Sequence, residues 1–259
     1  MTIDARATAE ALFKATRTRT PVPPLTTTNP DMTVQDAYAV QSELCDMLLA
    51  DGDRVVGYKL GLTSAPMQQL MGVDEPDYAP VFASGVVDDG AAVEVSRFIQ
   101  LKVEAEIALM LDRPLTGPGV TALEASRAIA GAAAAIEIVD SRIEDWKIKL
   151  PDTIADLASS GAVVLSSQLV PITDIDVRLI GMVITRNGEL VSTGAGAAAL
   201  GNPIQAVAWL ANTLAPHGVT LEAGRFVMTG ALSAAFPAQP GDVIRAEFDR
   251  LGPVTVRMI

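Results

Sequence analysis

The segment Lys102–Met110, KVEAEIALM, constrains the fold more than any other, because it places two glutamates inside an apolar strand-like run. Side chains alternate between the two faces of a β-strand, so Glu104 and Glu106 share one face and apolar side chains line the other. Two like charges side by side on a half-buried strand repel each other and resist the loss of water. The sequence therefore predicts either a solvated strand face or a group that neutralises both acids.

The order of the predicted elements indicates an α+β fold with a largely β core. Residues 1–53 are typical of two helices joined by a proline-rich connection, and we expect them to form a small N-terminal helical appendage. Residues 54–259 hold the strand-like segments and form the predicted β-rich domain that carries the site, with one continuous domain as the alternative. Helices expected over 121–135 and 203–218 interrupt these strands without strict alternation, which argues against a doubly wound sheet.

Charge and composition exclude several classes of function. The chain has a formal net charge of −12 and no basic cluster, which argues against nucleic acid or an anionic membrane as a partner. No apolar run reaches the roughly 18–20 residues that span a bilayer, and the first helix lacks the apolar core of a signal peptide, so we expect a cytoplasmic protein. Cys45 is the only cysteine, which excludes internal disulfides and thiolate metal sites. His217 is the only histidine, so any metal site must be built from oxygen ligands.

A third acid, Glu137 in AAAAIEIVDSR, also lies in an apolar strand-like segment. Carboxylates in apolar strands are unfavourable unless they are protonated, paired or bound to a metal. Either each of the three acids faces solvent or pairs with an arginine or lysine, or all three hold one divalent cation. Because the available ligands are oxygen atoms, Mg²⁺ is favoured, with Mn²⁺ or Ca²⁺ as alternatives.

Five further polar residues are candidates for the site, and each also has an ordinary structural explanation. Lys59, in GYKLGLTS, either reaches the surface or serves as a cation or proton donor beside an anionic substrate. Asp77 belongs to the loop DEPDYAP, whose acids would ordinarily be solvated. Arg142 either clamps a carboxylate or forms a surface ion pair with a nearby acid. Ser159 and Ser160 either bind a carboxylate or simply form a turn before a glycine.

Seven segments occur in an order and at spacings that identify a family. They are GYKLGLTS, MGVDEPDY, VEAEIALML, EIVDSRIEDW, DTIADLASSG, LGNPIQAVAWLA and MTGAL. Over about residues 30–259 the chain resembles the 2-keto-4-pentenoate hydratase (2-hydroxypenta-2,4-dienoate hydratase) and 4-oxalocrotonate decarboxylase family, which is related to the fumarylacetoacetate hydrolases. The resemblance implies a mixed β-sandwich or roll of the fumarylacetoacetate hydrolase C-terminal type with flanking helices, assembled as a homo-oligomer.

The same resemblance assigns roles to five of the acids and lysines. Glu104, Glu106 and Glu137 match the metal ligands of the family residue by residue, and the metal implied is Mg²⁺, with Mn²⁺ possible. Lys59 and Asp77 match its active-site lysine and aspartate. We therefore expect a metal site with a neighbouring acid–base pair.

The substrate-binding residues follow from the same likeness. Ser159 and Ser160 match the serine-rich turn after the IAD motif, and we group Arg142 with them as a substrate ligand. Two positions depart from the family pattern: Leu157 stands where many relatives have asparagine, and Ala79 stands where relatives often have glycine. These departures leave the metal ligands unchanged and bear on the identity of the substrate.

The implied function is metal-dependent addition of water to a short 2-hydroxy-2,4-dienoate, giving a 4-hydroxy-2-oxo acid, in the degradation of aromatic compounds. The partner is then a small 2-oxo or 2-hydroxydienoic acid. A 4-oxalocrotonate-type decarboxylase that forms the dienoate is the first alternative, and a hydratase or isomerase of a longer dicarboxylic acid is the second. A non-catalytic partner subunit of a sister enzyme is the last alternative. A complex with a sister enzyme of the same pathway is considered as well.

Overall fold

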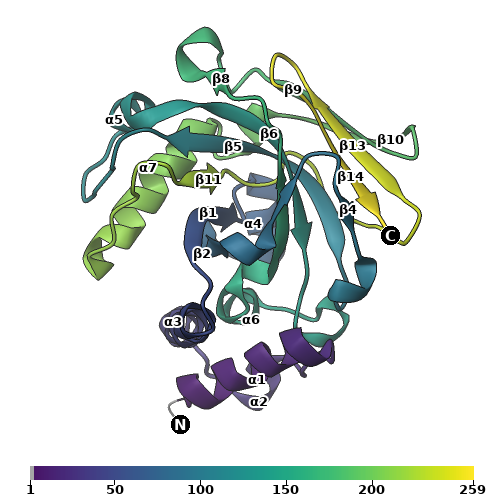
Figure 1. The fold of residues 1–259 in the computed structure, drawn as a ribbon. Helices are drawn as coiled ribbons and strands as arrows, with labels where there is room; N and C mark the ends of the chain where they lie inside the picture. Colours follow the sequence, from purple (N-terminus) through teal and green to yellow (C-terminus); the bar gives the residue numbers. More distant parts are fainter. Residues whose placement is uncertain (1–2) are drawn as a thin grey trace.

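The computed structural model describes residues 3–259, and most of its strands belong to one curled, nine-stranded sheet (Figure 1). These strands are β1 Val55–Gly61, β2 Asp77–Phe82, β3 Val86–Asp88, β5 Lys102–Leu111, β6 Ile129–Val139, β7 Ser160–Leu165, β8 Val170–Pro171, β11 Phe226–Met228 and β12 Phe236–Pro237. Their order is β2-β1-β11-β5-β6-β7-β3, with β12 beside β5 and β8 beside β6. The strand with two glutamates, β5, therefore lies in the middle of the sheet.

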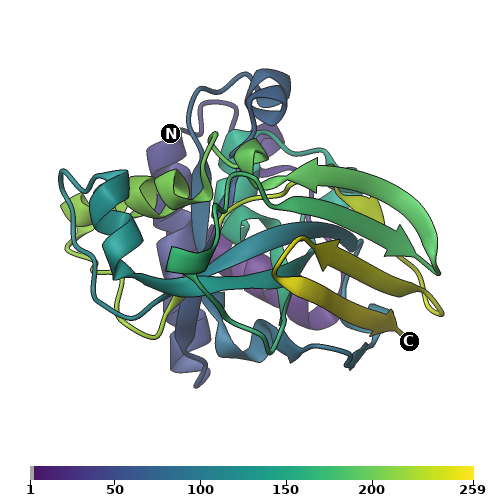
Figure 2. The same cartoon turned by 90° about the horizontal axis from the view of Figure 1, so that it is seen from above.

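A second sheet of five strands packs over the first (Figure 2). Its strands are β4 Ala92–Val93, β9 Gly181–Arg186, β10 Glu189–Ala195, β13 Val243–Phe248 and β14 Gly252–Met258, in the order β10-β9-β13-β14-β4. Ile184 and Val256 of this sheet share one apolar core with Ile107 and Ile136 of the large sheet. Two packed sheets with flanking helices confirm the α+β, sandwich-like fold expected from the sequence.

The large sheet curls until strands from its two ends share one interior. Val81 on β2 and Val163 on β7 belong to a single apolar cluster, together with Ala108 and Ala135 from the strands between them. Side chains two residues apart on a strand share a face, so the acids of β5 lie on the same face as Ala108. The acid-bearing face of β5 is therefore the inner face of this roll.

Within the described residues 3–259, seven α-helices flank the two sheets. They are α1 Ala5–Thr18, α2 Leu25–Thr28, α3 Val34–Ala50, α4 Ala65–Met71, α5 Ala122–Ala128, α6 Leu150–Ala155 and α7 Pro203–Leu214. Helix α7 packs beside α5, and both contribute apolar side chains, such as Leu210 and Ala125, to the main core. Within residues 3–259 no helix combines the length and the apolarity needed to cross a membrane.

The N-terminal helices pack directly on the rest of the chain. Helix α3 contacts α1 and α6, and a second apolar cluster joins α1 and α3 to Ala79 and Ile154. Thr33 and Asp36 form a capping box at the start of α3. The boundary expected after residue 53 stays a prediction, and the first two residues of the appendage lie outside the described part of the chain.

The helix expected over residues 121–135 is wrong in its second half. A capping box of Thr121 and Glu124 starts α5, but the helix ends at Ala128 and the next eleven residues form β6. Alanine favours helices, yet β6 is buried along almost its whole length between β5 and β7. Small side chains fit this crowded position under the second sheet, so tertiary packing overrides the local propensity.

Candidate active site

The three predicted acids meet inside the roll because β5 and β6 are neighbours. Glu104 lies directly opposite Glu137 in the antiparallel register, and Glu106 lies two residues farther along the same face. Glu106 and Glu137 are fully buried and Glu104 is partly exposed. One ligand oxygen from each acid lies within 4.8 Å of the others. The structure thus brings the predicted ligand set together.

This carboxylate triad, Glu104, Glu106 and Glu137, has the properties of a cation site. Among the described residues, Glu106 Oε1 and both carboxylate oxygens of Glu137 are buried without a hydrogen-bond partner. Burial, and then the charge of Glu137, raises the pKa of Glu104 and of Glu106. Buried oxygens that lack donors and repel one another fit a divalent cation, which would supply the missing positive charge.

Lys59 reaches the triad from β1, at the far side of β11. Its Nζ lies 2.8 Å from Glu137 Oε1, an ion pair without hydrogen-bond geometry, and donates a 2.8 Å hydrogen bond to the carbonyl of Ala158. Burial by itself lowers the pKa of Lys59, but the charges of Glu137 and Glu104 outweigh it and raise the pKa. The side chain is 3% exposed, so the alternative that it reaches the surface is wrong.

Asp77 opens β2, opposite Gly61 of β1 in the antiparallel register. Its side chain is buried, and a Cβ atom at position 61 would lie 2.1 Å from Asp77 Oδ1, so glycine is required there. Burial raises the pKa of Asp77 to about 6, although the charge of Lys59 opposes the shift. The alternative of a solvated loop acid is therefore wrong, and Asp77 is a buried carboxyl near Lys59.

Gly230 also contacts the triad, although no sequence pattern singles it out for that contact. Its backbone N–H donates a 2.8 Å hydrogen bond to Glu106 Oε2. Its φ is +107°, and a Cβ atom there would lie 1.8 Å from Thr63 Oγ1. Both observations require glycine. The segment MTGAL was recognised as a family motif, but only the structure shows that its glycine contacts a ligand of the proposed metal.

Arg142 binds residues of the loop that follows α6. Its Nε contacts Asp156 Oδ1, its backbone N–H donates to Asp156 Oδ2 at 2.9 Å, and its Nη1 donates to the carbonyl of Ser160. Arg142 is 4% exposed, so the alternative of a surface ion pair is wrong. A role as substrate ligand stays a prediction, while these contacts give Arg142 a role in positioning the loop.

The loop Leu157–Ser159 holds the carbonyl that binds Lys59. Its three residues have φ values of 54°, 49° and 55°, a left-handed conformation that is unfavourable for residues with a side chain. Ser159 Oγ lies 3.3 Å from Thr153 Oγ1 and Ser160 begins β7. Their proposed contact with a substrate stays a prediction. This unfavourable backbone conformation directs the carbonyl of Ala158 toward Lys59.

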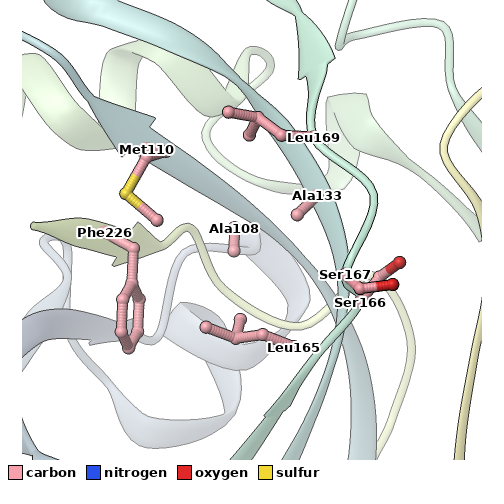
Figure 3. A pocket seen from close by; sticks show the side chains of 8 residues that line it. All are labelled: Ala108, Met110, Ala133, Leu165, Ser166, Ser167, Leu169 and Phe226. Atoms are coloured by element: carbon pink, nitrogen blue, oxygen red, sulfur yellow. The ribbon is translucent and has the colours of Figure 1, made fainter. Parts of the chain in front are cut away.

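A separate cavity of about 200 Å³ lies farther along the inner face of β5 (Figure 3). Met110, Leu165, Leu169 and Phe226 give it a mainly apolar lining. Figure 3 shows these side chains around Ala108, two residues beyond Glu106, and the predicted site residues are not among those that line it. The candidate chemistry therefore lies at the triad and not in this cavity.

Known proteins match this chain along nearly its whole length. A family model described as "Fumarylacetoacetate (FAA) hydrolase C-terminal" matches residues 54–259. The 2-keto-4-pentenoate hydratase of Paraburkholderia xenovorans (strain LB400) is 45% identical over 246 residues, which are 95% of this chain and 91% of that protein. The 4-oxalocrotonate decarboxylase of Pseudomonas sp. (strain CF600) is 42% identical over 238 residues, 92% of this chain and 90% of that protein.

One solved structure also matches nearly the whole length of this chain. It is the 4-oxalocrotonate decarboxylase from Pseudomonas putida G7 complexed with magnesium and adipate, with a TM-score of 0.96 and 39% identity. The match covers 98% of this chain and 97% of that chain. The likeness therefore includes the N-terminal helices as well as the strands that carry the triad.

Proposed function

This chain belongs to the fumarylacetoacetate hydrolase family, and we propose that it is a hydro-lyase that adds water to a short 2-hydroxy-2,4-dienoate, releasing a 4-hydroxy-2-oxo acid. The resemblance inferred from seven sequence segments is confirmed by the family match and by the relatives. Several of those relatives are named as hydratases of 2-keto-4-pentenoate or 2-hydroxypentadienoate, which supports this activity.

The observation that carries the proposal is the grouping of charges inside the roll. Three carboxylates of the triad meet one ammonium, Lys59, beside the separate carboxyl of Asp77. One ammonium and one divalent cation would together supply three positive charges for the three carboxylates. An anionic 2-oxo acid can then approach a site whose negative charge is balanced.

We propose that Glu104, Glu106 and Glu137 hold one Mg²⁺, with Mn²⁺ as the alternative. Their clustered and unpartnered oxygens support a hard divalent cation. The magnesium in the similar decarboxylase structure supports the same class of metal. When bound, the ion would act as a Lewis acid toward the oxygen atoms of a 2-oxo acid and favour negative charge on them.

Asp77 is the proposed proton carrier. With a pKa of about 6, its buried carboxyl is present in both protonation states near neutral pH. The ionised form can take the proton of the 2-hydroxyl and deliver it to the terminal carbon of the dienol, and it can then take a proton from the water that adds at C4 and deliver it to C3. Within residues 3–259, Oδ1 of this buried carboxyl has no hydrogen-bond partner and is free to make such contacts.

Lys59 is the proposed electrostatic partner. Its raised pKa keeps the ammonium charged, so it acts as a cation and not as a base. Its hydrogen bond to Ala158 O and its ion pair with Glu137 hold this charge beside the triad. There it can stabilise negative charge that develops on a bound 2-oxo acid.

The test is turnover of 2-hydroxypenta-2,4-dienoate with Mg²⁺, followed as loss of the dienol absorbance. We expect dienol loss that requires the metal and yields a 4-hydroxy-2-oxo acid. Absence of turnover, together with CO₂ release from 2-oxo-3-hexenedioate, would replace the hydratase assignment with that of a decarboxylase.

The decarboxylase is the second candidate because a named decarboxylase matches the fold almost completely. The same groups serve both reactions, since loss of CO₂ from the far carboxylate of 2-oxo-3-hexenedioate also places negative charge on the C2 oxygen. Hydratase remains the main proposal because relatives of that name support it at similar or higher identity. The meeting of all three acids in one site disfavours a non-catalytic partner subunit.

Several sequence predictions remain proposals. We propose a homo-oligomer in the cytoplasm that acts in the degradation of aromatic compounds, with a sister enzyme of the same pathway as a further partner. Arg142, Ser159 and Ser160 remain proposed substrate ligands, although Arg142 already bonds to the Asp156 loop.

A further inference from the structure

Helix α3 precedes the residues that the family model matches, yet one of its side chains bonds to two segments of the site. Gln41 is 4% exposed, and its Nε2 donates one hydrogen bond of 3.0 Å to the carbonyl of Tyr78 and another of 2.8 Å to the carbonyl of Ile154. The two acceptors lie on β2 and α6, far apart in the sequence. Gln41 therefore ties two separate segments together with a single amide group.

One acceptor is adjacent to a group that the proposed reaction uses, and the other precedes the loop that binds such a group. Tyr78 follows Asp77, whose Oδ1 has no hydrogen-bond partner in the described part of the chain. Ile154 lies in the last turn of α6, and the loop after that helix presents Ala158 O to Lys59. A shift of either carbonyl would change the position of Asp77 relative to Lys59.

Other contacts of α3 support the same link. The ring of Tyr38 stacks on that of Tyr78, with centroids 4.8 Å apart and an interplanar angle of 22°. Burial, and then the charge of Asp77, raises the pKa of the Tyr38 hydroxyl. Ala79 and Ala158 belong to the apolar cluster that contains the buried face of α3.

We propose that Gln41 is a positioning residue, which holds Asp77 and the loop that binds Lys59 at a fixed separation. The inference rests on the proposed function for its effect on turnover, but the tether itself is independent of the substrate. It also assigns a role in catalysis to the N-terminal helices. Lys59 and Glu137 are the charged groups that shift the pKa of Asp77, and Gln41 acts on their spacing without contacting the substrate.

The test replaces Gln41 with methionine, which keeps the length of the side chain and removes both hydrogen bonds. We expect kcat to fall, by up to roughly 100-fold, because a displacement of about 1 Å costs that much in a positioned site. KM and the affinity for Mg²⁺ should stay within about twofold, since the triad is untouched. Gln35→Met on the exposed face of the same helix is the matched control and should behave as wild type.

Two readouts separate positioning from general stability. In an Asp77→Asn background, Gln41→Met should have little further effect on kcat, whereas a purely structural loss would reduce turnover by the same factor in both backgrounds. A ¹³C NMR titration of the Asp77 carboxyl should also show a shifted midpoint in Gln41→Met. An unchanged titration together with unchanged kcat would overturn the inference.

The titration also separates this inference from the proposed function. If the wild-type protein turned over neither dienoate nor oxo-diacid, the proposed function would fail. A shifted Asp77 midpoint in Gln41→Met would then still support the tether, and an unshifted midpoint would reject it.

Discussion

The ammonium of Lys59 lies 2.8 Å from Oε1 of Glu137, and both side chains are buried. The two residues come from strands separated by β11 and β5, so the curl of the large sheet is what brings them together. The pair explains how Glu137 is tolerated in the interior without a metal. It leaves the charges of Glu104 and Glu106 for the proposed divalent cation to balance.

Replacing Lys59 with methionine should destabilise the metal-free protein. The substitution keeps the length of the side chain but leaves Glu137 without its cation and Ala158 O without its donor. Removing one partner of a buried ion pair costs about 3–5 kcal/mol. Urea denaturation with EDTA should show a loss of this size in the free energy of unfolding. In a separate assay with Mg²⁺, dienoate turnover should also fall.

Lys147→Met is the control for this prediction. Lys147 pairs with Asp145 at the surface, where its side chain is 63% exposed, so its loss should leave the free energy of unfolding almost unchanged. Equal stability losses for the two variants would show that the Lys59–Glu137 pair stabilises the fold no more than a surface pair does.

Replacing Glu106 with glutamine should remove the metal site and preserve the fold. The neutral amide is nearly isosteric and relieves the repulsion among the triad, so the metal-free protein should melt at the same temperature or higher. Calorimetric titration should show affinity for Mg²⁺ reduced by roughly 100-fold or more. The exposed Glu189→Gln should bind Mg²⁺ as wild type does. Metal-dependent turnover that persisted in Glu106→Gln would refute the ligand assignment.

The sequence could predict the triad because alternation along a strand is a local property. The spacing of Glu104 and Glu106 by itself places both on one face of β5. The position of Glu137 opposite Glu104 depends on the register of β5 and β6, which the residues alone do not reveal. Resemblance to a family supplied that step, and it also supplied the pairing of Lys59 with Asp77.

The remaining features depend on tertiary packing that no local pattern encodes. The alanine-rich segment before Glu137 favours a helix locally and becomes β6 only because β5 and β7 enclose it. The contacts of Gln41 and Gly230 join segments more than thirty residues apart, and neither residue stands out in the sequence. The capping box of Thr33 and Asp36, by contrast, spans one helical turn, and a pattern this local can be read from the sequence.

The pH dependence of turnover should report Asp77. Its folded pKa of about 6 lies above the ordinary value, so the ionised base is lost as the pH falls through 6. If the base form is required, kcat/KM should rise with pH to a plateau, with a midpoint near 6. Asp77→Asn should abolish this limb and reduce turnover while binding Mg²⁺ normally.

Asp74 provides the control for the pH profile, because it lies exposed in the same acidic loop. Asp74→Asn should keep both the midpoint and the plateau of the wild-type protein. A midpoint that persisted in Asp77→Asn would assign the titration to another group and contradict the proposed role of Asp77.

Replacing Gly230 with alanine should damage the triad through the backbone. An alanine Cβ would lie 1.8 Å from Thr63 Oγ1, so the segment must move and carry its N–H away from Glu106. Gly224→Ala is the matched control, because its φ of +80° is also positive but nothing lies within 4 Å of the added atom. Gly224→Ala should lose only about 1–2 kcal/mol of stability, because of the added backbone strain, and it should keep its affinity for Mg²⁺.

Urea denaturation and calorimetric Mg²⁺ titration of the two alanine variants separate strain from contact. Gly230→Ala should lose more stability than Gly224→Ala, and it alone should bind Mg²⁺ more weakly, because Glu106 loses its donor at Oε2. Equal stability losses with unchanged affinity would mean that Thr63 moves aside and that the Gly230 N–H does not position Glu106. A weaker affinity confined to Gly230→Ala would establish that a backbone group outside β5 and β6 orients a triad carboxylate.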